Sequence, residues 1–256
     1  MIRTFRIYLL KQVQKLSAAH AKERLEKARL ARIANVAPSR LSRILSDLAQ
    51  KLKSEQLQGP RNRPGHWEIT LRGKWPSRRV TVAAAPPPYV EVEVSIWFRK
   101  TSGWLVVFEA NRALSDASVF LVADALAGSV ESVSSISLDH AHWNAVRTWL
   151  KRTDGELLGG RFYKTSAAGT DLEWIALRRT AGSDPSLLEE SFEGAQGIGE
   201  LLIQTSHIES LDGKVTSRIG RAGNIRVYGN DISDGAIEAL LLELEGIWEE
   251  ISVQRT

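Results

Sequence analysis

The N-terminal third of the chain is organised around residues 28–52, which read ARLARIANVAPSRLSRILSDLAQKL. The first part of this stretch has apolar residues at the i, i+3, i+4 spacing of one helix face, at Leu30, Ile33 and Ala34. Asn-Val-Ala at 35–37 is typical of a turn, because asparagine tolerates left-handed backbone angles, and Pro38 suits the first position of a following helix. The stretch therefore predicts a helix, a three-residue turn and a second helix.

The second predicted helix has two chemically different faces. One is an apolar stripe that holds the helix down, formed by Leu41, Ile44, Leu45, Leu48 and Leu52. The other offers side chains suited to the DNA major groove, because arginine can grip guanine through two hydrogen bonds and serine or glutamine can reach base edges. The predicted groove contacts are Ser39, Arg40, Arg43, Ser46 and Gln50. A helical hairpin with a solvated polar face gives the same spacing, so this pattern alone leaves both interpretations open.

The sequence after this stretch favours DNA binding. A polar spacer is predicted at 53–64, and the alternation of Trp67, Ile69 and Leu71 then predicts a strand with one buried face. The strand ends in Ile69-Thr70-Leu71-Arg72-Gly73, and a basic turn is predicted at 72–74. Residues 20–82 thereby resemble the winged helix-turn-helix family, in which a hydrophobic-Thr-x-x-Gly strand is common and a β-hairpin with a basic tip follows the recognition helix.

The resemblance implies that a basic wing lies beside the recognition helix on duplex DNA. The basic residues expected to contact phosphates are Lys51, Arg61, Arg63, Arg72 and Lys74. Phosphate contacts would then set the affinity, and the arginines of the recognition helix would set the sequence preference.

The distribution of charge supports a polyanionic partner. Residues 1–80 hold 19 Lys or Arg against 5 Asp or Glu, a formal charge of +14, whereas the other 176 residues hold 15 against 25, a charge of −10. A solvated basic face would need less charge than this, so the asymmetry favours nucleic acid at the N-terminal part and an acidic partner domain after it.

The region before this stretch is predicted to be helical. Residues 5–19 place Phe5, Leu9, Val13 and Leu16 on one stripe, and residues 22–34 continue as a further helix. The first helix could open the winged domain or could form a homodimer, which many DNA-binding proteins need in order to grip two half-sites.

The predicted domains are a basic winged helix-turn-helix domain at 1–83, a Pro-rich linker at 84–88 and an acidic domain at 89–256. Alternating Val90, Val92, Val94 and Ile96 open the last of these with an antiparallel strand, a second strand follows at 104–110, and a helix runs from about 115 to 127. A similar ββα pattern closes the chain over 214–251. Between them we predict a strand near 133–138, a helix at 142–151, a hairpin over 160–178 and a short helix near 185–190, with 198–206 ambiguous.

The overall prediction is an α/β (α+β) fold, with an antiparallel sheet and helices on one face in the second domain. This architecture resembles the TATA-binding-protein-like fold and the centromere protein N and L domains. The two ββα units suggest an internal pseudo-repeat within that domain. The acidic domain is expected to form a homodimer or to bind a protein partner.

Enzymatic chemistry is not expected. Zero cysteines exclude thiol catalysis and thiolate metal sites. Asp139, His140 and His142 offer possible metal ligands, but Asp139 stands where a helix-capping residue is expected. Asp171 and Glu173 could suggest a nuclease, yet position 175 is isoleucine where the common nuclease pattern has lysine. We predict no catalytic residue, no metal and no cofactor.

The predicted function is double-stranded DNA binding, as a transcription regulator, a segregation or centromere-type factor, or an adaptor of a defence system. One alternative is an RNA or single-strand binder that stacks bases on an exposed Trp97; another is a protein-interaction subunit of a larger assembly. No apolar run spans a membrane and no secretion signal is evident, so a cytoplasmic, nucleoid-associated, prokaryotic protein is expected. The absence of cysteine and the single methionine fit a thermophile.

Overall fold

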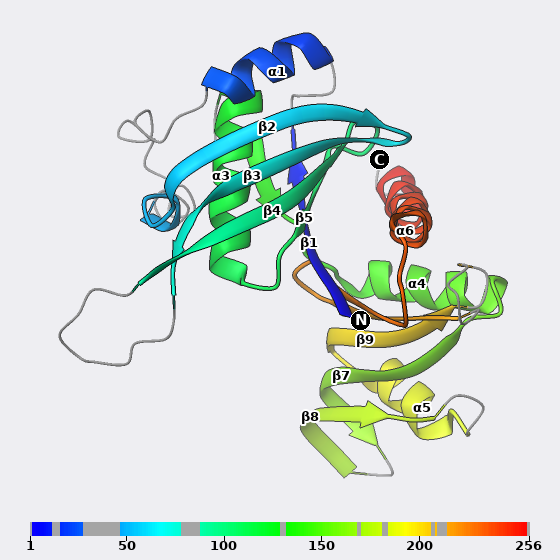
Figure 1. Cartoon of the computed structure of the whole chain (residues 1–256). Helices are drawn as coiled ribbons and strands as arrows, with labels where there is room; N and C mark the ends of the chain where they lie inside the picture. Colours follow the sequence, from blue (N-terminus) through cyan, green and yellow to red (C-terminus); the bar gives the residue numbers. More distant parts are fainter. Residues whose placement is uncertain are drawn as a thin grey trace. The chain divides into compact units, whose positions relative to one another are not determined.

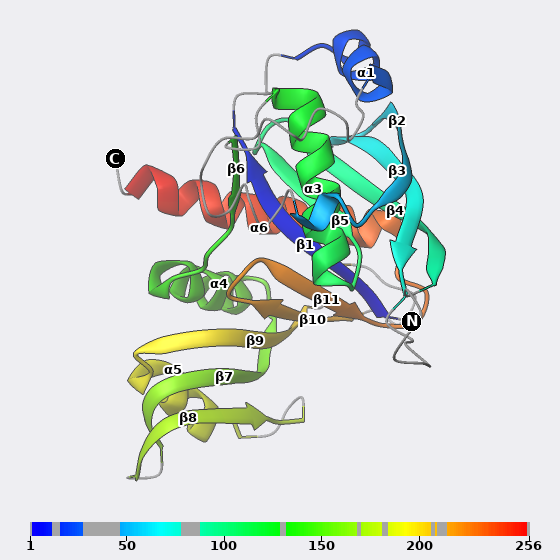
Figure 2. The same ribbon diagram turned by 90° about the vertical axis from the view of Figure 1, so that its left-hand side faces the viewer.

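The computed structural model divides the chain into two compact units, Phe5–Ser135 and Met1–Thr4 with Ile136–Thr256. They are called here the N-terminal unit and the C-terminal unit, and both are visible in Figures 1 and 2. The structure describes residues 2–11, 16–27, 47–77, 88–128, 132–167, 170–180, 184–205, 208 and 214–254.

The N-terminal unit is an antiparallel sheet with helices α1 (Ala18–Lys27) and α3 (Arg112–Ala127). The strand order is β2-β3-β4-β5-β1, and β6 also pairs with β1. The strands of this sheet are β1 (Ile2–Leu10), β2 (Lys53–Arg63), β3 (His66–Pro76), β4 (Tyr89–Arg99), β5 (Trp104–Phe108) and β6 (Val133–Ser135). Residues Ile2–Thr4 of β1 are counted with the C-terminal unit.

Alternation of side chains explains why β3 and β4 form this sheet. Trp67, Ile69 and Leu71 of β3 are buried, and they lie on the same face as the buried Val94, Ile96 and Phe98 of β4. Helix α3 covers this face and contributes most of its own side chains to the core (Figure 1). The helix begins at Asn111, whose side chain accepts hydrogen bonds from the backbone N–H groups of Ala113 and Leu114.

The strands of the C-terminal unit are also antiparallel, and their order is β8-β7-β9-β10-β11. Its strands are β7 (Glu156–Ala167), β8 (Thr170–Arg178), β9 (Gly197–Thr205), β10 (Val215–Gly220) and β11 (Asn224–Tyr228). Its helices are α4 (His140–Arg152), α5 (Ser186–Gly194) and α6 (Asp234–Gln254). Helices α4 and α5 contact β7, and Figure 2 shows α5 behind β7 and β8, with the face of these strands opposite α5 toward the viewer.

The coarse prediction of a mixed fold with a large antiparallel sheet is confirmed. Both predicted ββα patterns are present, as β4-β5-α3 and β10-β11-α6. They lie in different compact units, so the prediction that they close the two ends of one domain is wrong. The hairpin predicted over 160–178 is β7 and β8, and the ambiguous stretch 198–206 falls in β9.

The predicted helix at 5–19 is wrong over residues 5–10, which belong to strand β1, and only its last two residues, Ala18 and Ala19, are helical, at the start of α1. This strand pairs with β5 on one side through Tyr8↔Leu105 and with β6 through Tyr8↔Ser135. Phe5, Ile7, Tyr8 and Leu10 are all buried. A strand in the middle of a sheet is apolar on both faces, and such a run has no period that separates it from a buried helix. Of the helix predicted at 22–34, residues 22–27 belong to α1 and the rest lie outside the described residues.

Two predictions in the wing region are also wrong. Residues 53–63 are strand β2 rather than a spacer, and Arg72-Gly73-Lys74 lies inside β3 rather than in a turn, opposite Glu93, Val92 and Glu91 of β4. The turn falls instead at Pro64-Gly65, where Gly65 has φ +80°. Glycine adopts this angle without the steric cost that other residues incur.

The structure divides the chain elsewhere than at the predicted linker. Strands β3 and β4 pair from Trp67↔Phe98 to Pro76↔Tyr89, so the two sides of 84–88 belong to one sheet. Of the linker itself only Pro88 is described, and its carbonyl accepts a hydrogen bond from the Ser77 N–H. The division falls instead between Ser135 and Ile136.

Candidate nucleic-acid interfaces

The predicted recognition helix is described only at its C-terminal end. Ser39, Arg40, Arg43 and Ser46 lie outside the described residues, as do Leu41, Ile44 and Leu45 of the apolar stripe. Residues 47–49 are helical, Leu52 is fully buried, and Leu48 packs against the core of the N-terminal unit. Gln50 and Lys51 are exposed, so this end of the segment has the polarity that the sequence predicts.

A β-hairpin, β2 and β3, follows this segment directly. Its tip carries Arg61 and Arg63, two of the predicted phosphate contacts. Arg61 is exposed and has no ion-pair partner among the described residues. Arg63 Nε donates to Glu68 Oε2 at 3.0 Å, and their side chains are 54% and 24% exposed. A surface pair of this kind contributes little to stability, so Arg63 can exchange its carboxylate for a phosphate at small cost.

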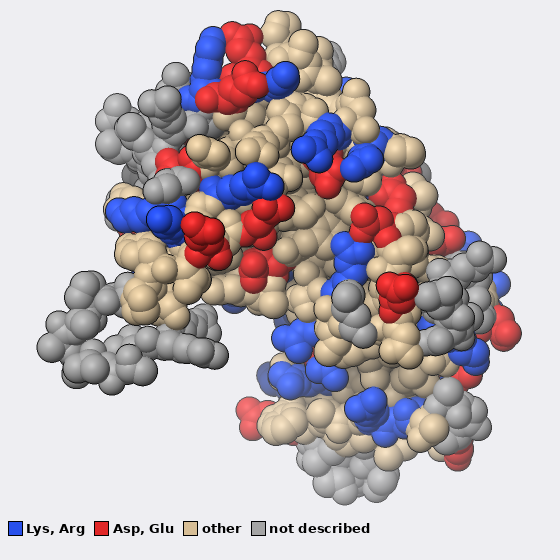
Figure 3. Space-filling model, in the orientation of Figure 1, with Lys and Arg blue, Asp and Glu red and all other residues tan. Residues whose placement is uncertain are grey.

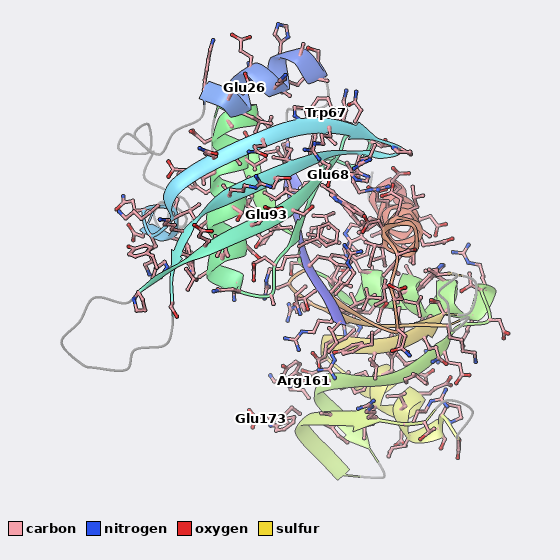
Figure 4. The ribbon with its side chains drawn as sticks, viewed as in Figure 1. Glu26, Trp67, Glu68, Glu93, Arg161 and Glu173 are labelled. Carbon is pink, nitrogen blue, oxygen red and sulfur yellow. The ribbon has the colours of Figure 1, made fainter. Side chains whose placement is uncertain are left out.

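Basic and acidic side chains alternate over β3 and β4. Arg72 Nε donates to Glu93 Oε2 at 2.7 Å, and Lys74 is the cross-strand neighbour of Glu91. These side chains, with Gln56, line a concavity of about 490 Å³. Figure 3 shows the mixture of signs on this part of the N-terminal unit, and Figure 4 labels Glu68 and Glu93 there. Acids therefore offset the charge that the sequence assigns to Arg72 and Lys74.

Trp97, the predicted stacking residue, is buried. Its ring stacks on His66 at a centroid distance of 4.1 Å and lies 4.5 Å from Phe108, and its exposed fraction is 3%. The ring faces are thus occupied by protein. Trp97 is not available to unpaired bases, and this expected platform for a single strand is wrong.

The histidine cluster at the start of α4 is a helix cap. Asp139 accepts hydrogen bonds from the N–H groups of Ala141 and His142, and His142 Nδ1 lies 2.6 Å from Asp139 Oδ1. His142 also packs on Trp248 at a centroid distance of 4.9 Å. Within the described part of the chain, no group of three His, Asp or Glu side chains could hold a metal ion. The side chain of Asp171, the first of the two acids considered for a nuclease, lies outside the description.

The sequence interpretation missed an aromatic and basic surface on the C-terminal unit. We call it the open sheet face, formed by Arg161 and Tyr163 of β7 and Trp174 and Arg178 of β8. Trp174 is 59% exposed and Tyr163 is 38% exposed, and the two residues are directly opposite each other in the β-ladder. Alternation of these residue types at i, i+2 along both strands was the signal available in the sequence.

Comparison of the chain with protein-family models and with curated proteins finds no match. None of the helices described in the structure has the length and apolar character needed to cross a membrane. Function is therefore inferred from the residues themselves.

Proposed function

We propose that the protein binds double-stranded DNA through the basic segment 28–74. The predicted recognition helix enters the major groove, and the β2–β3 hairpin lies against the phosphates beside it. The observation that carries this proposal is the run of exposed cations from the end of that helix through the hairpin. Among them Lys51, Lys53 and Arg61 have no ion-pair partner in the described part of the chain.

Salt dependence of duplex binding tests this proposal. The test measures binding of the full chain to a random-sequence duplex by fluorescence anisotropy across a salt series. A log-log slope of about −4.5 to −6.3 is expected, because five to seven neutralised phosphates each contribute about −0.9. No binding at low salt would refute the proposal and would assign the basic segment to an acidic protein partner.

Paired variants separate base contacts from phosphate contacts. Arg40→Ala/Arg43→Ala should weaken binding to a selected site by about 1–3 kcal/mol per lost base contact. Lys51→Ala/Arg61→Ala should weaken binding to all duplexes alike and reduce the slope by about 1.8. Arg112→Ala removes an arginine with a 75% exposed side chain on α3 and is the matched control. It should leave the binding affinity and the salt slope unchanged. If Arg40→Glu/Arg43→Glu leaves DNA binding intact, the helix serves a protein interface instead.

The proposal includes a homodimer, since two copies could grip two half-sites. Two large apolar side chains on helices of the C-terminal unit, Leu187 and Leu242, are 42% and 55% exposed and could contribute to such an interface. Light scattering coupled to gel filtration, over a range of concentrations, tests for the dimer. A monomer at every concentration would refute it.

A further inference from the structure

We propose that the open sheet face of the C-terminal unit is a second nucleic-acid site, which binds a single strand by stacking its bases on Trp174 and Tyr163. This site is independent of the proposed duplex site, since it uses none of the same residues. The sugar is not part of the recognition, so single-stranded DNA and RNA are both expected to bind.

The register of β7 and β8 sets the geometry of this face. Tyr163 is opposite Trp174, Arg161 is opposite Ala176, and Arg178 is one row further along. Successive rows on one face of a strand are about 7 Å apart. Ala176, the cross-strand neighbour of Arg161, carries only a methyl group. A strand crossing the face would therefore meet two aromatic rings and then two guanidinium groups.

Tyr163 lies over a glycine, which fixes its position on the sheet. A Cβ atom added to Gly199 of β9 would be 2.7 Å from Tyr163 Cε2 and 3.0 Å from its hydroxyl oxygen. Only glycine permits an aromatic ring to approach the neighbouring strand so closely. The ring is thus spread across β9 rather than standing away from the sheet, and 38% of the residue remains exposed.

The charge of this face complements a phosphate backbone. Arg161 and Arg178 are exposed, and neither has an ion-pair partner among the described residues. Figure 4 shows Arg161 projecting outward from β7, and in Figure 3 basic side chains border the same part of the C-terminal unit. The acid opposite Arg161 in the β-ladder is Glu200 of β9, and its Oε1 lies 3.6 Å from Arg218 Nη1. Glu173, labelled in Figure 4, is exposed. Exposed rings combined with unpaired arginines are the features that single-strand binders use, because every base has a stacking face and every nucleotide has a phosphate.

The test is binding of the full chain to oligo(dT) and oligo(U) of twelve nucleotides, measured by anisotropy at low salt. Trp174→Leu keeps an apolar side chain but removes the ring, and it should weaken binding by about 5- to 150-fold. Trp174→Phe should retain most of the affinity, because it keeps a ring. Tyr89→Ala removes a tyrosine of the N-terminal unit that is 45% exposed and should have no effect. Equal losses for Trp174→Leu and Trp174→Phe would contradict stacking.

Two further variants test the remaining features. Gly199→Ala should weaken binding, because the added methyl group displaces the Tyr163 ring; circular dichroism and the unfolding midpoint show whether the fold is kept. Arg161→Ala/Arg178→Ala should reduce the log-log salt slope by about 1.4, two phosphates at about 0.7 each. Arg152→Ala on α4, with a side chain 57% exposed, is the matched charge control.

The outcomes distinguish this site from the duplex site. If Trp174→Leu weakens single-strand binding and leaves duplex binding unchanged, the open sheet face is a separate single-strand site. If single strands bind and only Lys51→Ala/Arg61→Ala weakens them, the face is not a nucleic-acid site and the inference is overturned. If neither oligonucleotide binds at low salt, it is overturned whatever the duplex result.

Discussion

Replacing Tyr8 with phenylalanine tests whether the start of the chain is a strand fixed to α3. The Tyr8 hydroxyl donates a hydrogen bond to Asp116 Oδ1 at 2.6 Å, which joins β1 to α3 across 108 positions of sequence. Tyr8 is 7% exposed and the Asp116 side chain is 17% exposed. If residues 5–19 were a helix, this contact would not form.

The expected cost follows from the nature of this bond. A hydrogen bond to a charged group contributes about 1.5–3 kcal/mol. Asp116 keeps a second contact in the variant, because Arg112 Nε lies 3.7 Å from its Oδ2. We therefore expect Tyr8→Phe to lower the free energy of unfolding by about 1.5–2 kcal/mol at pH 7, the lower part of that range.

The pH dependence of this difference gives a sharper test. Burial raises the pKa of Tyr8 well above its ordinary value of 10.0, and the carboxylate of Asp116 raises it further. The folded state therefore keeps the phenol protonated while the unfolded chain ionises it. The protonated phenol therefore makes its full contribution to the free energy of unfolding below pH 10, and this contribution falls above pH 10. For the wild type, the free energy of unfolding is lower by about 1.4 kcal/mol at pH 11. The difference in unfolding free energy between wild type and Tyr8→Phe should accordingly narrow to about 0.1–0.6 kcal/mol at pH 11.

Urea unfolding at pH 7, 9, 10 and 11 measures both effects, with Tyr89→Phe as the control for a tyrosine that is 45% exposed. A cost of Tyr8→Phe below about 0.5 kcal/mol at pH 7, in the range of ordinary surface substitutions, would refute the hydrogen bond. A gap that stays constant up to pH 11 would refute the protonation argument.

Three other substitutions test local features of the fold by the same measurement. Gly73→Asn should destabilise by about 1–3 kcal/mol, because a Cβ there would lie 3.1 Å from both Leu52 Cδ1 and the Lys53 carbonyl; a residue in a turn would tolerate asparagine. Gly128→Ala should cost about 1 kcal/mol, since Gly128 ends α3 at φ +69° and no contact opposes a methyl group there. Asp139→Ala should cost about 1 kcal/mol through loss of the α4 cap, with the same value in the presence of a chelator.

Alternation of residues predicted the strands well where one face is buried. Trp67, Ile69 and Leu71 gave β3, and Val94 and Ile96 marked the buried face of β4. The same reasoning failed for β1, because both faces of that strand are buried, and for β2, because its side chains are mostly polar. Charged pairs across strands, such as Arg72 with Glu93, depend on register, which a single sequence does not reveal.

The candidate sites were less predictable from the sequence than the strands. The hairpin after the predicted recognition helix was expected from the family resemblance, although its turn lies eight residues earlier than the motif suggested. The burial of Trp97 could not be foreseen, since His66 and Phe108 reach it only in the folded sheet. The exposure of Trp174 was equally hidden, because it depends on which face of β8 the helices leave uncovered.

The division of β1 between the two units bears on how the chain folds. The C-terminal unit includes residues 1–4, and Arg3 forms an ion pair with Asp234 of that unit. The Arg3–Asp234 contact closes a loop of 231 positions. Closing a loop of this length costs about 5 kcal/mol of chain entropy beyond the constant term, and this cost slows folding. During synthesis the unit cannot be completed until its last helix has left the ribosome. A fragment that begins at residue 136 would lack residues 1–4 of its own unit, so a permuted fragment that joins residues 1–4 to the C-terminal half is the better route to isolating the unit.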